Sequence, residues 1–526
     1  MKIALLIDGG SIARWQADAI EKLGPGFRFT IFNCTNHRAG KRKVRHSLYY
    51  LLNILSLRTR LTRRLGVPTS LAVEDQQNFE CEYEGAWQRL PDDLIERLNG
   101  LDLDCIVKFG MGLLRVPSAS RLPIPILSYH HGDPRTFRGR PAGFYESLQG
   151  KRVIGQVIQK LSNTLDAGAV LAFAETKVHP HSYRQTMIEA FGASSYLLPQ
   201  ALRNAANPTP LSIEPNGKNY RLPSNWTVTR FAARSVSAKL RRLAYGMFIE
   251  KAWQVAEAPL PHDEASLFDT FPDPSSWRTL PQPAGYRFLA DPFPHPSGEG
   301  VLVEALSSRN GRGEILHLGA SGPRVLLSGK GHFSYPSTLL TNGEALVVPE
   351  VCGWSEPTLF RLAGDKAFEV GQIDIDGNPR LIDPTLFERD GTTYLFANRL
   401  SEGHSILRLW YSNSAFDRFT EHPASPIRIS PVGSRMGGAI VTLNGDSYRV
   451  GQDFSGQYGD GILLLRIREL SRTAYDEIPI KELRFGDRHG PHTLNLSERS
   501  ILFDYYTNRF SLSAGVRRAR SRWFGR

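Results

Sequence analysis

The chain of 526 residues contains 41% hydrophobic and 22% charged side chains, as soluble globular proteins do, and its length predicts two or three domains at roughly 100–200 residues each. The formal net charge is +12, but no aromatic-interleaved basic motif accompanies it, so we expect no nucleic-acid partner. The N-terminal apolar run is too short for a signal peptide, no run of about 18 apolar residues occurs, and the cysteines lack zinc-type spacing; we therefore expect a cytoplasmic protein without a metal site.

Residues 1–210 alternate short apolar runs, such as KIALLI, FRFTIF and IPILSYH, with segments of helical periodicity, such as SIARWQADAIEKL. Alternation of this kind predicts an α/β domain with a mostly parallel sheet and helices on its faces. Ligands of such sheets usually bind at the loops that follow the strands. A functional site is therefore expected where these apolar runs end.

Basic side chains concentrate in residues 38–64, around an apolar stretch, and in the basic tail 516–526. Three interpretations of the first segment stay open: a solvated helix face, peripheral contact with an anionic membrane surface, or attraction of an anionic substrate such as a nucleotide sugar.

The densest set of candidate catalytic residues lies in residues 128–178. Ser128 and His130 end an apolar run, Arg138-Gly139 follows eight residues after the histidine, and Asp166-Ala167-Gly168 begins 36 residues after it. A lone histidine at a strand end is more often structural, but this joint spacing favours a functional role.

Across residues 1–200, and most specifically across 100–178, the chain resembles the formyltransferase family that uses 10-formyltetrahydrofolate, which includes methionyl-tRNA and sugar-nucleotide formyltransferases. The resemblance implies that His130 is the acid/base or oxyanion donor and that Asp166 is its electrostatic partner. It implies 10-formyltetrahydrofolate as cofactor, with contacts from Phe109, Gly110, Met111, Leu113, Arg138 and Gly139.

Ser128 departs from this pattern, because the family has Asn at that position. An Asn amide donates an N–H to the formyl oxygen and reaches further than a hydroxyl, and loss of one oxyanion donor costs roughly 10²–10³ in rate. Three alternatives stay open: Ser128 donates its O–H less effectively, His131 fills the gap, or the domain no longer transfers formyl from folate.

Residues 211–248 are polar, basic and weakly periodic, and predict a connector with one helix. From residue 249 to 515, five similar segments recur at a period typical of propeller blades, which predicts a five-bladed β-propeller. Three copies carry Asn-Gly or Asp-Gly between two β-like runs, the signal of a tight hairpin, and residues 249–285 are expected to supply the strand that closes the ring. The five segments start at Asp291, Tyr335, Asp383, Gly437 and Gly490.

The repeat region resembles the propellers of glycoside hydrolase family 43, and more closely the propeller of glucosamine inositolphosphorylceramide transferases. The likeness rests on LADPFPHP, LIDPTLFERDGTTYLF, SRMGGAIV, YRVGQDFSGQYGDGILLLRI and GPHTLN. Carboxylates at the segment starts would point into a central funnel, although Asp-Pro can also simply close a turn. We expect substrate contacts there from Asp291, Asp383, Arg435, Gln452 and His492.

These features favour an enzyme that transfers a formyl group from 10-formyltetrahydrofolate to an amino sugar or sugar nucleotide, with the propeller recognising the carbohydrate. Two alternatives remain. One is a carbohydrate-active hydrolase or transferase that uses the propeller funnel. The other is a non-catalytic glycan-binding scaffold in surface-polysaccharide biosynthesis.

Overall fold

The computed structural model describes residues 1–36, 43–68, 71–206, 211, 213–260, 271–353 and 356–524. Parts of the predicted basic segments, residues 38–42 and 525–526, lie outside the described residues. The chain divides into two compact units, residues 1–241 and 242–526, here called the N-terminal unit and the C-terminal unit. Most of the predicted connector 211–248 forms one continuous helix, α7 (Asn225–Phe248), and the boundary between the two units falls within it.

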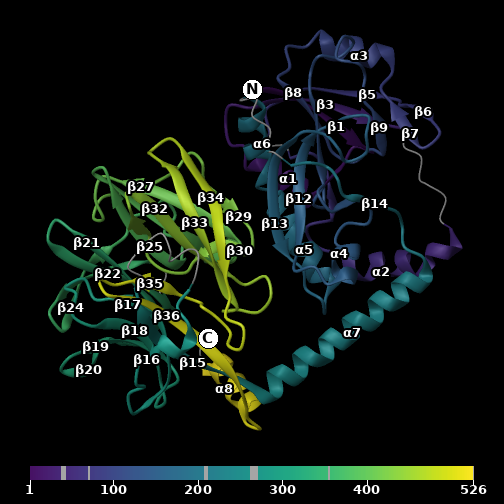
Figure 1. Cartoon of the computed structure of the whole chain (residues 1–526). Helices are drawn as coiled ribbons and strands as arrows, with labels where there is room; N and C mark the ends of the chain where they lie inside the picture. The colour runs from purple at the N-terminus through teal and green to yellow at the C-terminus, as the bar shows by residue number, and fades with distance from the viewer. Residues whose placement is uncertain are drawn as a thin grey trace. The chain divides into compact units, whose positions relative to one another are not determined.

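The N-terminal unit is built around a seven-stranded sheet with the order β13-β12-β10-β8-β1-β3-β5 (Figure 1). Strands β10, β8, β1, β3 and β5 run parallel to one another, whereas β12 pairs antiparallel with both β10 and β13. The sheet is therefore mostly parallel, as predicted. Its strands are β1 (Lys2–Asp8), β3 (Arg28–Cys34), β5 (Val73–Phe79), β8 (Cys105–Lys108), β10 (Ile126–His130), β12 (Val153–Lys160) and β13 (Val170–Lys177).

Helices cover both faces of this sheet, which is why its central strands are apolar on both sides. On one face, Trp15 of α1 packs against Tyr129 of β10, Phe191 of α5 packs against His131 just after that strand, and α6 packs against β12 and β13. On the other face, Leu94 and Leu98 of α3 share a core with Leu6 of β1. The helices of this unit, besides α7, are α1 (Arg14–Glu21), α2 (Ser47–Leu57), α3 (Asp92–Asn99), α4 (Phe144–Gln149), α5 (Tyr183–Ser194) and α6 (Leu197–Ala206).

Three small sheets complete the N-terminal unit. They join β2 to β4, β11 to β14, and β6 to β7 and β9. Their strands are β2 (Ile12–Ala13), β4 (Arg64–Leu65), β6 (Glu82–Glu84), β7 (Trp87–Arg89), β9 (Leu113–Arg115), β11 (Phe137–Gly139) and β14 (Lys218–Tyr220).

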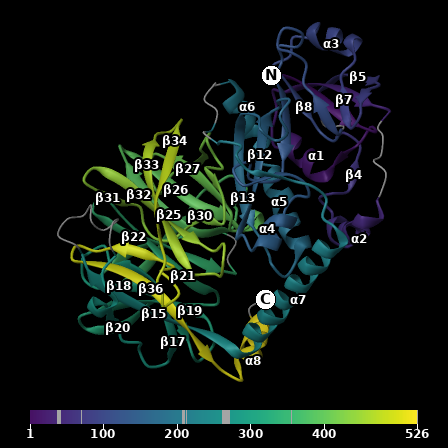
Figure 2. The same cartoon turned by 45° about the vertical axis from the view of Figure 1, so that its right-hand side comes forward.

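The described residues of the C-terminal unit form five antiparallel sheets of four or five strands each (Figures 1 and 2). Strand β15 pairs with β36 along its whole length, so the first and last strands of the unit share one sheet. The sheets are β16-β15-β36-β35 (Arg278–Thr279, Ile249–Pro259, Ser500–Phe510, Leu494–Leu496), β17-β18-β19-β20 (Tyr286–Pro294, Val301–Ser307, Gly313–Gly319, Gly322–Leu327) and β21-β22-β23-β24 (His332–Thr341, Glu344–Cys352, Thr358–Ala363, Lys366–Gln372).

The other two sheets contain a fifth strand each. One is β25-β26-β27-β28 (Leu381–Arg389, Thr392–Arg399, Ile406–Ser412, Thr420–Glu421), in which β29 (Arg428–Ile429) also pairs with β27. The other is β30-β32-β33-β34 (Val432–Met436, Asp446–Asp453, Gly461–Leu470, Tyr475–Leu483), in which β31 (Val441–Leu443) also pairs with β32. The described chain ends in α8 (Ala514–Phe524), which contains most of the predicted basic tail.

The first strands of the five sheets contact one another in cyclic order. Strand β17 contacts β21, β21 contacts β25, and β25 contacts β30. The circle closes because the Leu494 amide donates a 2.8 Å hydrogen bond to the Gly437 carbonyl oxygen, and because β35 and β36 contact β17. Strand β15, from the predicted closing region 249–285, pairs with β36 in this sheet, and closure of a five-bladed propeller stays a prediction.

The repeat residues have a common backbone conformation. Asp291, Tyr335 and Asp383 all have a positive φ, between 45° and 48°, at irregularities in β17, β21 and β25. Such bulges re-aim a side chain away from the normal alternation of a strand. The three predicted Asn-Gly and Asp-Gly hairpins are confirmed, since Asn342, Asp390 and Asn444 and the glycines after them have positive φ and connect paired strands.

Candidate functional site

The N-terminal unit brings His130 and Asp166 together at the end of β10. The His130 Nδ1 atom lies 3.4 Å from Asp166 Oδ1, and both side chains are largely buried. The His130 Nε2 atom lies 3.2 Å from the Phe137 carbonyl oxygen, so both ring nitrogens face protein partners. The Gly139 amide donates a 2.8 Å hydrogen bond to Asp166 Oδ2 and fixes the carboxylate. This arrangement gives an imidazole whose orientation is set by a carboxylate.

The alternation of β10 separates Ser128 and His130 from the residues between and after them. Ser128 and His130 share one face of the sheet, whereas Tyr129 and His131 point to the other, where both pack against Trp15. His131 Nε2 lies 3.0 Å from Ser194 Oγ, and burial, with the nearby His130, lowers the pKa of His131 to about 3. His131 is therefore a core residue on the far face, and it cannot fill the gap left by Ser128.

Several residues predicted to contact the cofactor are engaged with the protein itself. Phe109 is 1% exposed and packs against Trp15 and Tyr129. The Arg138 guanidinium donates hydrogen bonds of 3.1 Å and 3.0 Å to two backbone carbonyl oxygens, those of residues 165 and 215. A Cβ atom on Gly139 would lie 2.2 Å from the Tyr220 carbonyl oxygen, so this close approach requires glycine.

Three further residues from that prediction, Gly110, Met111 and Leu113, lie just after β8. Gly110 and Met111 form a turn with positive φ of 77° and 51°, and Leu113 begins β9. Contact of these residues with 10-formyltetrahydrofolate stays a prediction.

Lys108 belongs to the same edge of the sheet, and the sequence motifs did not point to it. It ends β8 and is the direct strand partner of Ser128. Burial lowers its pKa to about 8, while the charges of Asp166 and Asp8 act in the opposite direction. Its position at the end of an apolar strand, CIVK, is the one sequence signal that could have identified it.

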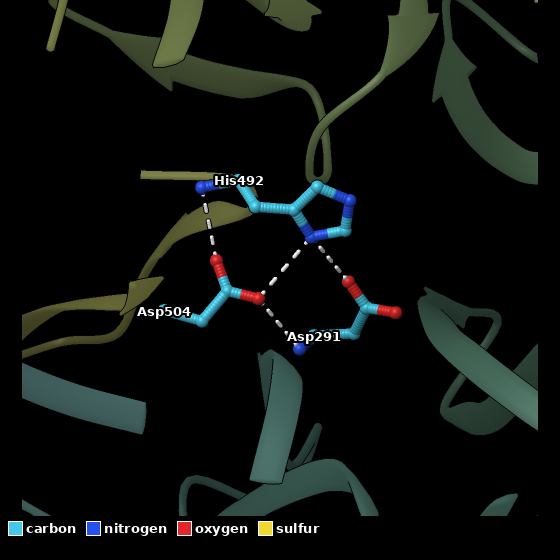
Figure 3. Close-up of side chains that lie close together, drawn as sticks. All are labelled: Asp291, His492 and Asp504. Carbon is cyan, nitrogen blue, oxygen red and sulfur yellow. Dashed lines mark hydrogen bonds and ion pairs between the residues drawn. The ribbon is translucent and has the colours of Figure 1, made fainter. Parts of the chain in front are cut away.

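The C-terminal unit brings Asp291, His492 and Asp504 together (Figure 3). His492 Nδ1 lies 3.2 Å from both Asp291 Oδ1 and Asp504 Oδ2. Burial lowers the pKa of His492, but interactions with Tyr458 and the two carboxylates outweigh it and raise the pKa well above its usual range. Burial raises the pKa of the Asp291 carboxyl, but the contacts with His492 and Thr493 outweigh burial and lower this pKa to about 2. The ligand atoms of the three residues lie within 4.8 Å of one another, and the raised pKa of His492 makes the protonated imidazole itself the positive charge between the two carboxylates.

A second group lies around Asp383, and it contains the other predicted substrate-binding residues. The Arg435 guanidinium makes a two-pronged ion pair with the Asp383 carboxylate. Gln452 Nε2 donates a 2.8 Å hydrogen bond to Asp383 Oδ2. The Asp383 amide in turn donates a 3.1 Å hydrogen bond to Glu350 Oε2. The five residues predicted from the segment starts thus form two buried groups, one around Asp291 and one around Asp383.

Tyr458 connects the two groups, and sequence reasoning did not identify it. Its ring centroid lies 4.7 Å from the His492 ring and 5.2 Å from the Arg435 guanidinium carbon. Tyr458 is 43% exposed, in contrast to the buried charges beside it. The site therefore presents one accessible aromatic ring above two charge pairs.

Glu350 is the titratable member of this site near neutral pH. Burial and the Asp383 carboxylate raise its pKa to about 8, while the Arg435 charge partly offsets the shift. At neutral pH, Glu350 is therefore mainly a protonated acid, while Asp291 is ionised.

The described part of segment 38–64 presents both apolar and basic side chains. Leu48, Leu51 and Leu55 of α2 are 40%, 51% and 65% exposed and recur at helical spacing. A groove of about 690 Å³ lies at the end of this helix, and Arg58, Arg60 and Arg63 are among its lining residues. Among the described helices, none is both long and apolar enough to cross a bilayer.

Comparison with known proteins places the similarity mainly in the C-terminal unit. Residues 317–496 match the family described as glucosamine inositolphosphorylceramide transferase 1, N-terminal. The chain is 31% identical over 218 residues to glucosamine inositolphosphorylceramide transferase 1 of Oryza sativa subsp. japonica, and 26% identical over 224 residues to that of Arabidopsis thaliana. The matches cover 38% and 40% of this chain but only 29% of each relative's length. The resemblance to these transferases is confirmed.

Two solved structures illustrate weaker likenesses. The N-formyltransferase from Helicobacter canadensis, in complex with folinic acid and dTDP-3-aminofucose, shows a TM-score of 0.26 and 11% identity over 42% of this chain and 71% of that chain. RS223 β-xylosidase shows a TM-score of 0.29 and 12% identity over 39% of this chain and 81% of that chain. At TM-scores this low, neither likeness establishes a shared fold or activity.

The substitution Glu350→Gln tests whether Glu350 is protonated at neutral pH in the folded protein. Because the pKa of Glu350 is raised from 4.5 to about 8, its contribution to stability is full below about pH 4.5 and is lost as the pH rises through about 8. We therefore expect the urea-unfolding midpoint of the wild type to fall, relative to that of Glu350→Gln, as the pH is raised from about 5 to about 8. The exposed Glu498→Gln variant is the control, and a difference for Glu350→Gln that does not change with pH would contradict the assignment.

Proposed function

We propose that the C-terminal unit is a five-bladed β-propeller that binds a carbohydrate above Asp291 and Asp383. The single observation that carries this proposal is the exposed Tyr458 ring, which lies against both His492 and Arg435. Aromatic rings stack on the apolar face of a sugar, while nearby polar groups bind its hydroxyls. The cyclic order of the five sheets and the similarity to sugar transferases support the same assignment.

The local charges favour a neutral or amino sugar over a strongly anionic one. The carboxylates of Asp291 and Asp383 are each compensated by one cation, His492 and Arg435. No net positive charge is therefore left in these two pairs for a phosphate. Because the names of the relatives contain glucosamine, glucosamine and N-acetylglucosamine are the first ligands to test.

Substituting Tyr458→Ala removes the stacking surface and leaves the two charge pairs in place. We expect the affinity for glucosamine or N-acetylglucosamine to fall at least about tenfold, equivalent to about 1.4 kcal/mol, in calorimetric titrations. The matched control is Phe368→Ala, because Phe368 is 53% exposed in the same unit. Equal affinity of Tyr458→Ala and wild type, or no binding of either sugar by the wild type, would refute the proposed site.

The same residues also support catalysis on a bound sugar. Glu350 as the protonated acid and Asp291 as the ionised base supply the two carboxyl groups that cleavage or transfer of a glycosidic bond requires. Release of a reducing sugar that is lost in both Glu350→Gln and Asp291→Asn would identify a hydrolase. Binding without turnover would leave the unit as a glycan-binding scaffold.

A second candidate function is N-formyl transfer from 10-formyltetrahydrofolate to an amino sugar or sugar nucleotide in the N-terminal unit. The observation that favours it is the 3.4 Å approach of His130 to Asp166 at the end of a parallel strand. These two residues come from motifs far apart in the sequence, and their contact in the structure supports this candidate. The bound formyl donor would supply the one-carbon group, and His130 and Asp166 would orient it and handle the proton.

Formyl transfer predicts that Asp166→Asn lowers turnover by roughly 10²–10⁴, because the imidazole loses the carboxylate that orients and charges it. The assay combines 10-formyltetrahydrofolate with UDP-glucosamine and follows the mass gain of one formyl group. Asp102→Asn, at a carboxylate that is 97% exposed, serves as the control. If the wild type transfers no formyl group to any amino-sugar acceptor, this candidate fails.

We also propose that α2 and its basic groove contact an anionic membrane surface. Exposed leucines would enter the interface while Arg58, Arg60 and Arg63 meet lipid phosphates. We expect a Leu51→Glu/Leu55→Glu variant to lose flotation with phosphatidylserine-containing vesicles, whereas Leu340→Glu, at an exposed leucine of the other unit, retains it. Flotation that survives the double substitution, or that is equal with pure phosphatidylcholine, would contradict the contact.

A further inference from the structure

We propose that Lys108 donates the hydrogen bond to the formyl oxygen that Ser128 is too short to supply. This inference rests on the formyl-transfer candidate and assigns a residue that neither the family pattern nor the sequence motifs contain. It explains how an Asn can be replaced by Ser in a site whose other parts are retained.

The strand register places Lys108 beside Ser128. The two residues are direct partners in the parallel pair of β8 and β10, so their side chains leave the sheet on the same face. Ile106 and Ile126, two residues earlier on each strand, confirm this face, because both belong to the core under α3. His130 follows on the same face, two residues after Ser128.

The other polar side chains near Ser128 already have hydrogen-bond partners, so Lys108 is the candidate donor to the formyl oxygen. Across the antiparallel pair with β12, Ser128 faces Gln159. The Gln159 side chain is already used, because its Oε1 accepts a hydrogen bond from the Gly168 amide and its Nε2 lies 3.5 Å from Asp166 Oδ1. Both ring nitrogens of His130 also face protein partners.

The Lys108 ammonium has N–H groups available for hydrogen bonds to a ligand. Among the described residues, its ammonium makes no hydrogen bond and no ion pair, although it interacts electrostatically with Asp166 and Asp8. Lys108 is only half-buried, so its ammonium can reach a bound ligand, and a hydrogen bond to that ligand would replace the water it loses. Because its pKa is lowered to about 8, the side chain still carries its proton in most molecules at neutral pH.

The transfer itself requires such a donor. The acceptor amine forms a bond to the formyl carbon, and the bond from that carbon to the folate nitrogen breaks. The amine loses one proton and the folate nitrogen gains one, while negative charge develops transiently on the formyl oxygen. A cation placed against that oxygen stabilises the charge more than a neutral hydroxyl does.

The test combines three variants in the assay with 10-formyltetrahydrofolate and UDP-glucosamine. Lys108→Met keeps the length of the side chain and removes its donors, so kcat is expected to fall by roughly 10²–10³. Adding Ser128→Asn to Lys108→Met restores the amide donor of the family and is expected to recover at least about tenfold of that loss. Lys151→Met, at an exposed lysine, is the control. An unchanged kcat in Lys108→Met, or a double variant no faster than the single one, would overturn the inference.

A second readout separates this inference from formyl transfer itself. Acetic anhydride labels lysines according to their pKa and access, and mass spectrometry reads the labelling of Lys108 with and without folinic acid. Protection of Lys108 but not of Lys151 supports its place at the formyl group, even if the wild type turns over no acceptor. Equal labelling with and without folinic acid overturns it, including when formyl transfer is observed.

Discussion

The candidate site of the C-terminal unit depends on one interaction: each carboxylate at a segment start, Asp291 and Asp383, is in contact with a cation. Asp291 is held ionised because His492 and Thr493 lie against it, and Asp383 is paired with Arg435 and Gln452. Removing water from a charge is costly unless a partner replaces the water. Since the pairs link segments that are far apart in the sequence, the sheets must be assembled before the site exists.

The bulges at Asp291, Tyr335 and Asp383 give this pairing its geometry. A positive φ of about 45–48° turns each residue out of the ordinary strand alternation, so that a polar group reaches the neighbouring sheet. The Tyr335 amide donates to Asp291 Oδ2, and the Tyr335 hydroxyl accepts from the Gly438 amide. The repeated residues therefore connect neighbouring sheets and also position the carboxylates. The Asp-Pro pairs thus have a structural role and a place in the candidate site at the same time.

In the N-terminal unit, strand alternation separates the two adjacent histidines. His130 faces Asp166, whereas His131 is packed against Trp15 and Phe191 with its pKa lowered to about 3. One residue of register thus decides which imidazole is available for chemistry. The same register places Lys108, rather than His131, next to Ser128.

The sequence by itself determined the mostly parallel α/β sheet and the five repeated segments, three of which carry an Asn-Gly or Asp-Gly turn. Those features are local or periodic, because hydrophobic alternation and positive-φ turn residues act within a few positions of the chain. Only the tertiary structure decided that Arg138 and Gly139 support the backbone, that Tyr458 lies between two charge pairs, and that Lys108 stands beside Ser128. Each of those contacts joins strands or loops that are distant in sequence. Whether such a contact forms depends on strand register, burial and neighbouring charge, and no single segment of the sequence encodes these.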